Sequence, residues 1–277
     1  MTHRWTQRLH SNPLAAWLLA VMLLALSSGC ANQQKNSDAA EEASQSSAGT
    51  ANENPARYRS RLHTELGANY LQRGQFAIAL EELREAVRVD PNYGLAHSIM
   101  GLVHANLNED ARAEAAFKRA VEVAPAEGDI RNQYGSYLCG LGRADEGLAQ
   151  FEAALRQPLY QTPHVALENA GSCALAASKI RVAEGYFTRL VQQSPFSPRG
   201  YQGLAAVALK TSRFDDVKRH VEQGLRTQQV TPQLLFFGVC AERKLGNKAR
   251  EDEYRSQLKS RFADSPLNEA IDRGGCE

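Results

Sequence analysis

The side chains in this chain of 277 residues that could do chemistry are mainly the thiols and imidazoles of five cysteines and seven histidines. His97 and His104 are seven residues apart, about two turns of one helix, so they could in principle share a metal ion. Both stand where the surrounding pattern places large packing residues, as at Tyr70, so we expect a packing role. No G-x-S-x-G, glycine-rich phosphate loop or His-Glu-x-x-His occurs. The chain therefore gives no sign of catalysis, and we expect no enzyme, metal, cofactor or small-molecule substrate.

Cys30 ends a segment with the features of a targeting signal. Arg4 and Arg8 precede an apolar run from Leu14 to Leu26, which has signal-peptide length and is short for a membrane-spanning helix. The run ends in Leu26-Ser27-Ser28-Gly29-Cys30, which resembles a bacterial lipoprotein signal, although its leucine lies four rather than three residues before the cysteine. The resemblance implies removal of residues 1–29 and a covalent lipid on Cys30. The alternative is an ordinary secretory signal with an incidental cysteine.

Lipidation would anchor the mature N-terminus to a membrane. In Gram-negative lipoproteins an aspartate after the modified cysteine usually marks inner-membrane retention, whereas Ala31 and Asn32 follow here. The resemblance thus implies the periplasmic face of the outer membrane, an oxidising compartment in which cysteines can pair. Residues 31–55, which follow Cys30, contain no large apolar side chain. We therefore expect residues 30–55 to form a lipidated N-terminus and a flexible tether that spans roughly 25–30 Å.

A 34-residue unit is written twice, without a gap, between Ser60 and Pro125. Small residues recur where two helices must approach closely, bulky apolar residues recur at helical spacing, and a proline ends each unit. This pattern resembles the tetratricopeptide repeat. The matched positions are Leu66-Gly67 with Met100-Gly101, Tyr70 with His104, Ala79 with Ala113, Leu83 with Phe117, Ala86 with Ala120, and Pro91 with Pro125.

Further units follow with weakening similarity, and the turn from Gln157 to Pro163 carries two extra residues. We therefore predict an all-α fold, a right-handed superhelix of about six tetratricopeptide repeats over residues 56–266. A degenerate last unit is typical of solenoids, because an end repeat has one neighbour only. The predicted units are about 60–93, 94–127, 128–163, 164–197, 198–230 and 231–266, followed by a tail at 267–277.

The repeat family implies that the first helix of each unit lines a concave groove through its second, fifth, ninth, twelfth and thirteenth positions. Three leucines at such positions in the first two units would form an apolar trough, the kind of patch that marks a partner site. A helix or extended peptide with apolar anchors would fit it. The alternative is that the tether or the next repeat covers the leucines. The predicted groove residues are Ala68, Leu71, Leu95, Leu102, Ala105 and Asn132.

Four cysteines remain beyond Cys30. Cys139 and Cys173 lie 34 residues apart in the first helices of consecutive units. Packed helices lie about 8–10 Å apart, so facing positions can approach within the roughly 7 Å between Cα atoms that a bridge allows. We predict a Cys139–Cys173 disulfide, with two buried thiols as the alternative. Cys276 is one residue from the end and expected to be mobile; its pairing with Cys240 is left open, because nothing in the pattern supports it.

Two segments resemble the type IV pilus biogenesis lipoproteins, the pilotins of the PilF/PilW kind. They are Asn132-Gln133-Tyr134-Gly135-Ser136-Tyr137-Leu138-Cys139 and Glu168-Asn169-Ala170-Gly171-Ser172-Cys173. The resemblance implies a lipid-anchored partner of the pilus secretin that promotes its outer-membrane localisation and multimerisation, and hence twitching motility. A repeat scaffold of another envelope-assembly complex is the alternative. The net charge of +1 argues against a nucleic-acid partner.

Overall fold

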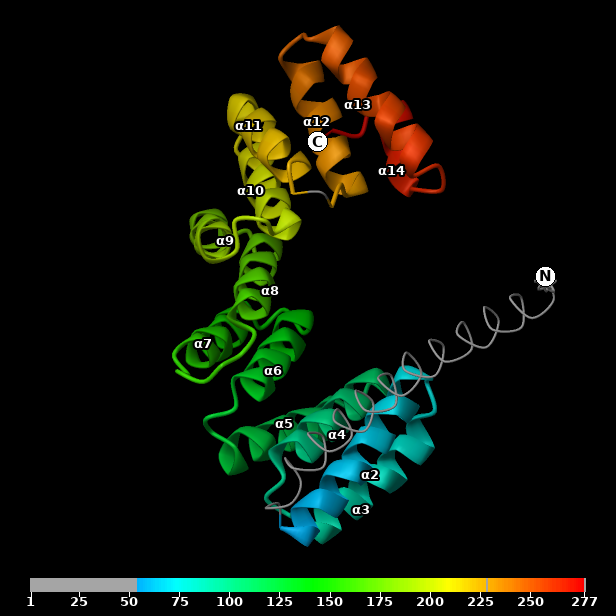
Figure 1. The fold of residues 1–277 in the computed structure, drawn as a ribbon, viewed down its shortest axis with the longest axis vertical. Coiled ribbons are helices and arrows are strands. Elements are labelled where there is room, and N and C mark those ends of the chain that lie inside the picture. The colour runs from blue at the N-terminus through cyan, green and yellow to red at the C-terminus, as the bar shows by residue number, and fades with distance from the viewer. Residues whose placement is uncertain (1–53, 228, 277) are drawn as a thin grey trace, which may run out of the picture. The chain divides into compact units, whose positions relative to one another are not determined.

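The computed structural model describes residues 54–227 and 229–276, so the predicted signal peptide, Cys30 and nearly all of the predicted tether lie outside the described residues. Throughout those two ranges the regular structure is helical, without a strand (Figure 1). The predicted all-α superhelix of about six repeats is confirmed. The six helix pairs are α2 (Pro55–Gln72) with α3 (Phe76–Val89), α4 (Gly94–Asn106) with α5 (Asp110–Val123), α6 (Gly128–Gly140) with α7 (Ala144–Leu155), α8 (Pro163–Ala176) with α9 (Ile180–Gln193), α10 (Pro198–Lys210) with α11 (Phe214–Leu225), and α12 (Pro232–Lys244) with α13 (Lys248–Arg261).

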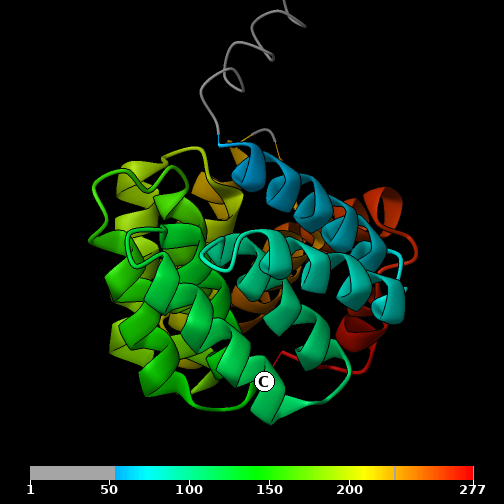
Figure 2. The same cartoon turned by 90° about the horizontal axis from the view of Figure 1, so that it is seen from below.

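Neighbouring pairs stack because the first helix of a repeat packs against both helices of the repeat before it, as α6, α8, α10 and α12 do (Figures 1 and 2). From α4 to α10, each first helix contacts its own second helix and the first helix of the next repeat, and α12 contacts α13 and α14. The Cα atoms of consecutive second helices from α5 to α13 do not come within 8 Å of each other, so these helices meet only through long side chains, such as Arg189 with Glu152. The first helices therefore lie closer together and line the concave side, and the second helices lie on the convex side.

The turn between the two helices of each repeat places one residue in the left-handed region. That residue has φ of 70° at Gly74, 57° at Asn108, 76° at Gly142, 57° at Ser178, 55° at Ser212 and 75° at Gly246. A residue in this conformation ends a helix by turning the chain back. Successive spacings of 34, 34, 36, 34 and 34 residues place the two-residue insertion between repeats three and four, as the sequence predicted.

Five of the six helix pairs are held by a glycine that meets a bulky side chain sixteen residues later, and in the pair of α10 and α11 the same position is Ala205. A Cβ added at Gly101 would lie 3.0 Å from the Phe117 ring, and one added at Gly135 would lie 2.9 Å from the Phe151 ring. Both rings are fully buried. Gly67 with Leu83, Gly171 with Phe187 and Gly238 with Tyr254 repeat the arrangement.

The C-terminal segment is ordered, so the expectation of a mobile Cys276 is wrong. The helix α14 (Pro266–Asp272) packs against α12 and α13, and Cys276 forms a disulfide with Cys240 of α12 across a Cα–Cα distance of 5.3 Å. Its side chain is 7% exposed. The last repeat has no further repeat beside it, and α14 covers its end by packing Ile271 into the apolar cluster that contains Tyr254 and Leu258. Glu251 takes the place of the small residue, and its carboxylate accepts a hydrogen bond from Arg243 at 2.9 Å.

Candidate protein-binding face

A disulfide joins repeats three and four on the first-helix side. Cys139 of α6 and Cys173 of α8 are linked with a Cα–Cα distance of 5.7 Å. Gly147 of α7 makes room for this bridge, because a Cβ there would lie 2.4 Å from the Cys139 Sγ and 2.8 Å from the Gly135 carbonyl oxygen. The bridge spans the loop at 156–162, the site of the insertion.

Hydrogen bonds link the first helices of repeats two, three and four in the same register. The Ser98 hydroxyl, at the fifth position of its repeat, donates to the Gln133 amide oxygen at 2.6 Å, at the sixth position of the next. One repeat on, the Asn169 amide donates to the Asn132 amide oxygen at 3.0 Å. Asn132 is 8% exposed. It thus lies on the predicted groove but is buried, and its side chain binds the next repeat.

The three groove leucines are half-buried rather than fully open. Leu71 and Leu95 pack against the cluster formed by Leu80, Leu83 and Ile99 of the first two repeats. Leu102 contacts this cluster and also the one that contains Phe117 and Leu138. The next repeat therefore covers part of Leu102, as the alternative interpretation held. The half-buried Ala68 and Ala105 flank the three leucines.

Ion pairs tie neighbouring second helices to each other. The Arg143 guanidinium, at the start of α7, pairs with the Glu114 carboxylate of α5 at 2.7 Å. Two repeats further on, Arg213 pairs with Glu184 at 2.8 Å with the same spacing of 29 residues. Hydrogen bonds from Arg143 and then Lys118 lower the pKa of Glu114 to about 2. The carboxylate is therefore ionised at any physiological pH.

The histidines noted in the sequence serve as packing groups with hydrogen bonds. His97 Nε2 lies 2.9 Å from the Pro91 carbonyl oxygen, and His104 Nδ1 lies 2.6 Å from the Glu109 carboxylate. Both side chains are buried. Over the described ranges, no group of three or more His, Cys, Asp or Glu side chains could hold a metal ion. Nor does any helix within 54–276 combine the length and hydropathy needed to cross a membrane.

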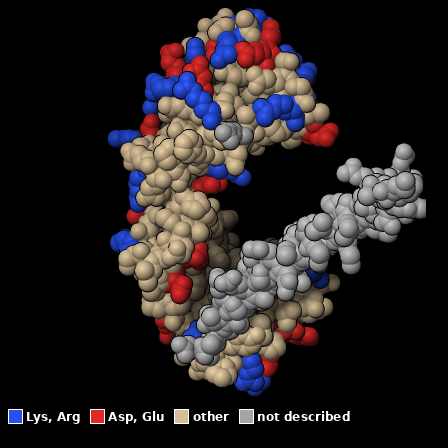
Figure 3. Space-filling view, in the orientation of Figure 1, with Lys and Arg blue, Asp and Glu red and all other residues tan. Residues whose placement is uncertain are grey.

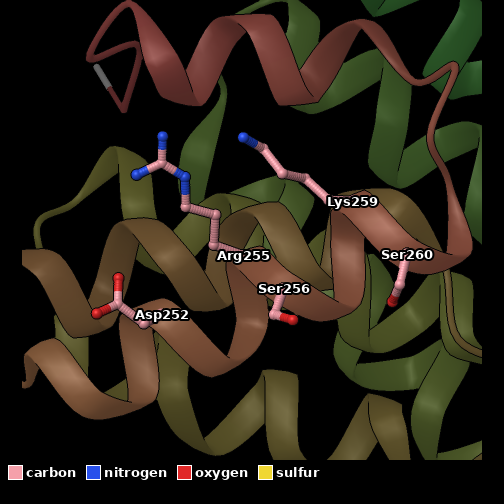
Figure 4. A pocket seen from close by; sticks show the side chains of 5 residues that line it. All are labelled: Asp252, Arg255, Ser256, Lys259 and Ser260. Atoms are coloured by element: carbon pink, nitrogen blue, oxygen red, sulfur yellow. The ribbon is translucent and has the colours of Figure 1, made fainter.

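A hollow on the outside of the last repeat is occupied by its own ion pairs. It is lined by Asp252, Arg255, Ser256, Lys259 and Ser260 of α13. Figure 4 shows Arg255 and Lys259 pointing together toward α14. There both pair with Asp272, whose pKa the Arg255 hydrogen bond lowers. These cations attach α14 to the domain, so we do not assign a ligand to this hollow.

Two open cavities among the described residues lie on the concave side of repeats four to six, beyond the units in which we predicted groove residues. One of about 560 Å³ is lined by Leu209, Phe214, Phe236 and Phe237, among others, and an adjoining one of about 110 Å³ reaches Glu168. The same positional rule would have found them: its twelfth and thirteenth positions in repeat five are Leu209 and Lys210. Figure 3 shows mostly uncharged side chains over α8 and α10, and both signs of charge mixed over α12 to α14.

Comparison with known proteins agrees with this architecture. A family model described as tetratricopeptide repeat matches residues 64–130 and 135–198. The type IV pilus assembly protein PilF of Pseudomonas aeruginosa is 23% identical over 203 residues, which cover 73% of this chain and 81% of that protein.

Two solved structures from the type IV pilus field share the fold. PilW, described as a widely conserved type IV pilus biogenesis factor, superposes with a TM-score of 0.66 and 27% identity over 76% of this chain and 97% of its own. Pseudomonas aeruginosa PilF superposes with a TM-score of 0.67 and 21% identity over 80% of this chain and 100% of its own. The chain therefore has the tetratricopeptide-repeat fold and is similar to two proteins of type IV pilus biogenesis.

Proposed function

We propose that this protein is a lipid-anchored pilotin that binds the type IV pilus secretin and promotes its outer-membrane localisation and multimerisation. The observation that carries the proposal is the similarity to PilW and PilF, which spans nearly the whole of both solved chains. The repeats supply a surface for protein partners, which agrees with the absence of a catalytic motif in the sequence.

The lipid signal and the tether support the same function. A lipid on Cys30 would hold the repeats within roughly 25–30 Å of the membrane surface. Tethering alone raises the effective concentration of two partners to about the millimolar range. A weak interaction with each secretin subunit would then suffice to gather subunits at the outer membrane.

The half-exposed leucines Leu71, Leu95 and Leu102 are the proposed contact for the secretin. Such side chains lose their remaining water contact when a partner's apolar anchor covers them, which favours binding by about 25 cal/mol per Å² of apolar surface. Because Ala68 and Ala105 have small side chains, the surface beside the leucines leaves room for a helix or an extended segment.

The direct test follows the secretin in cells with and without this protein, by unheated gels for the multimer and density gradients for its membrane. Loss of the multimer, or its retention in the inner membrane, is the expected result. Normal multimers in the outer membrane would refute the proposal and favour another envelope-assembly complex.

The binding surface can be tested with matched variants. Leu71→Ser with Leu95→Ser should abolish secretin multimers while the circular dichroism spectrum stays helical. Ile78→Ser with Val182→Ser, which change apolar side chains 40% and 43% exposed on second helices, should leave the multimers intact. Equal effects from the two pairs would refute the assignment of the surface. Cys30→Ser should separately abolish incorporation of labelled fatty acid.

A further inference from the structure

The larger concave cavity combines an apolar floor with two lysines. Phe236 and Phe237 of α12 lie edge to face with ring centroids 5.8 Å apart, and Leu209 of α10 joins them in lining a volume of about 560 Å³. Lys210 and Lys244 line the same cavity. An apolar hollow with a few polar groups is the usual form of a ligand site.

The two lysines occupy the same register in adjacent repeats. They are the last residues of α10 and α12 and lie 34 residues apart, one repeat length. The two helices are in contact. Both ammonium groups therefore come from the same end of neighbouring first helices, where one extended ligand can reach both.

These are also the lysines that the fold leaves unpaired. Among the seven lysines of the described ranges, five form ion pairs, and Lys210 and Lys244 form none with a described residue. The residues that line the cavity include no Asp or Glu. Two uncompensated cations beside an apolar hollow are complementary to a ligand that carries both carboxylates and a large apolar group.

The smaller cavity extends the surface toward repeat four. It shares Ala206 and Phe237 with the larger one and continues along α8, where Glu168 pairs with Arg199 at 3.6 Å. That carboxylate is already neutralised by Arg199 of repeat five. A surface that continues over three repeats fits an extended chain of several residues better than a compact ion.

From these observations we infer that the concave side of repeats five and six binds an acidic, extended peptide segment of a partner protein. A bulky apolar side chain of the segment fills the cavity against Phe236, Phe237 and Leu209. Carboxylates on either side of it pair with Lys210 and Lys244. This site is separate from the leucines of repeats one and two and does not depend on the identity of the partner proposed above.

The C-terminal disulfide helps to build the site. Cys276 lines the cavity and is held there by its bond to Cys240. Reduction would release this wall of the cavity together with the segment that follows α14. Peptide affinity should therefore fall in a reducing buffer, and Cys276→Ala should reproduce the loss under oxidising conditions.

The test uses the full chain in detergent and a fluorescein-labelled decapeptide with four carboxylates around a central phenylalanine. Fluorescence anisotropy should show saturable binding, and Lys210→Gln with Lys244→Gln should weaken it about tenfold. The matched control, Lys118→Gln with Lys248→Gln, removes two exposed lysines outside the cavity and should not change affinity. Ala206→Leu narrows the junction of the two cavities and should weaken binding without a change in charge.

Several results would overturn the inference. The first is that no saturable binding occurs up to millimolar peptide. The second is that both pairs of lysine variants lose the same affinity for the peptide, and the third is that affinity stays the same when serine replaces the phenylalanine of the peptide. Sedimentation of the protein with anionic phosphatidylglycerol vesicles, lost in the Lys210/Lys244 pair while the peptide does not bind, would assign the lysines to a lipid surface instead. A dimer in analytical ultracentrifugation that the same pair abolishes would assign them to a second copy of the chain.

Discussion

Removal of the Cys139–Cys173 bridge gives a quantitative test of how repeats three and four are coupled. The bridge closes a loop with a sequence separation of 34. In the chain-entropy description, a loop of that length stabilises the folded state by about 3.8 kcal/mol, because it restricts the unfolded chain. Cys139→Ala with Cys173→Ala should therefore lower the free energy of unfolding by about that amount, without adding a buried hydroxyl.

The assay is urea unfolding at pH 7, followed by far-ultraviolet circular dichroism, on the oxidised protein and on the double variant. The slope of the unfolding free energy with urea should stay the same while the midpoint falls. The Cys240→Ala, Cys276→Ala variant treated with a reductant is the matched control, because only the Cys139–Cys173 bridge is left in it to break, and it should lose a similar amount. A loss below about 1 kcal/mol at an unchanged slope would refute the chain-entropy account.

The second bridge provides an internal comparison. Cys240 and Cys276 close a loop with a separation of 36, for which the same description also gives about 3.8 kcal/mol. Cys240→Ala with Cys276→Ala should therefore cost a similar free energy. Hydrogen exchange should in addition become faster in α14, since the bridge is one of few attachments of that short helix.

Two further regions give predictions that depend on packing and charge. Gly203→Ala should destabilise the protein by about 1–3 kcal/mol, because its Cβ would lie 2.3 Å from the Phe187 ring. Gly185→Ala, with open space around it, should instead stabilise α9 by about 0.5–1 kcal/mol. Thermal unfolding of both variants tests the pair, and equal shifts of the unfolding temperature would contradict the packing argument. Glu114→Gln should cost about 1–2 kcal/mol at pH 7, since Arg143 holds a carboxylate that is 23% exposed. The pKa of Glu114 in the folded protein, about 2, lies below the ordinary 4.5, so the stability that the ionised carboxylate contributes is fully present above about pH 4.5 and lost as the pH falls toward 2. The urea midpoints of variant and wild type should therefore converge over that range. A constant difference between the midpoints would contradict the assignment.

The repeat period made most of the fold predictable. The recurrent spacing of small, bulky and turn residues, interrupted by one two-residue insertion, predicted six helix pairs, and the 34-residue period placed Cys139 beside Cys173. The repeat pattern did not predict the end of the last repeat. There Glu251 stands where the pattern has a small residue, and α14 supplies a cover that the pattern does not encode. With α14 unforeseen, Cys276 could only be taken for a residue of a free end.

The binding surface was harder to predict than the fold. A position on the first helix says which way a side chain faces but not whether a neighbour already occupies it. Asn132 faces the concave side and is bound by Asn169, and Leu102 is partly covered by the next repeat. Lys210 and Lys244 became conspicuous only when the ion pairs of the other lysines were known, since pairing depends on contacts between repeats.

The two disulfides also determine how the protein responds to mechanical force. A chain pulled from both ends lengthens by at most about 3.3–3.6 Å for each residue released from the fold. Residues enclosed by a bridge bear no load, and the separations of 34 and 36 residues together withhold about 230–250 Å of extension. If the lipid holds one end while a bound partner pulls on the repeats, the oxidised protein would yield in short steps and keep repeats three and four joined.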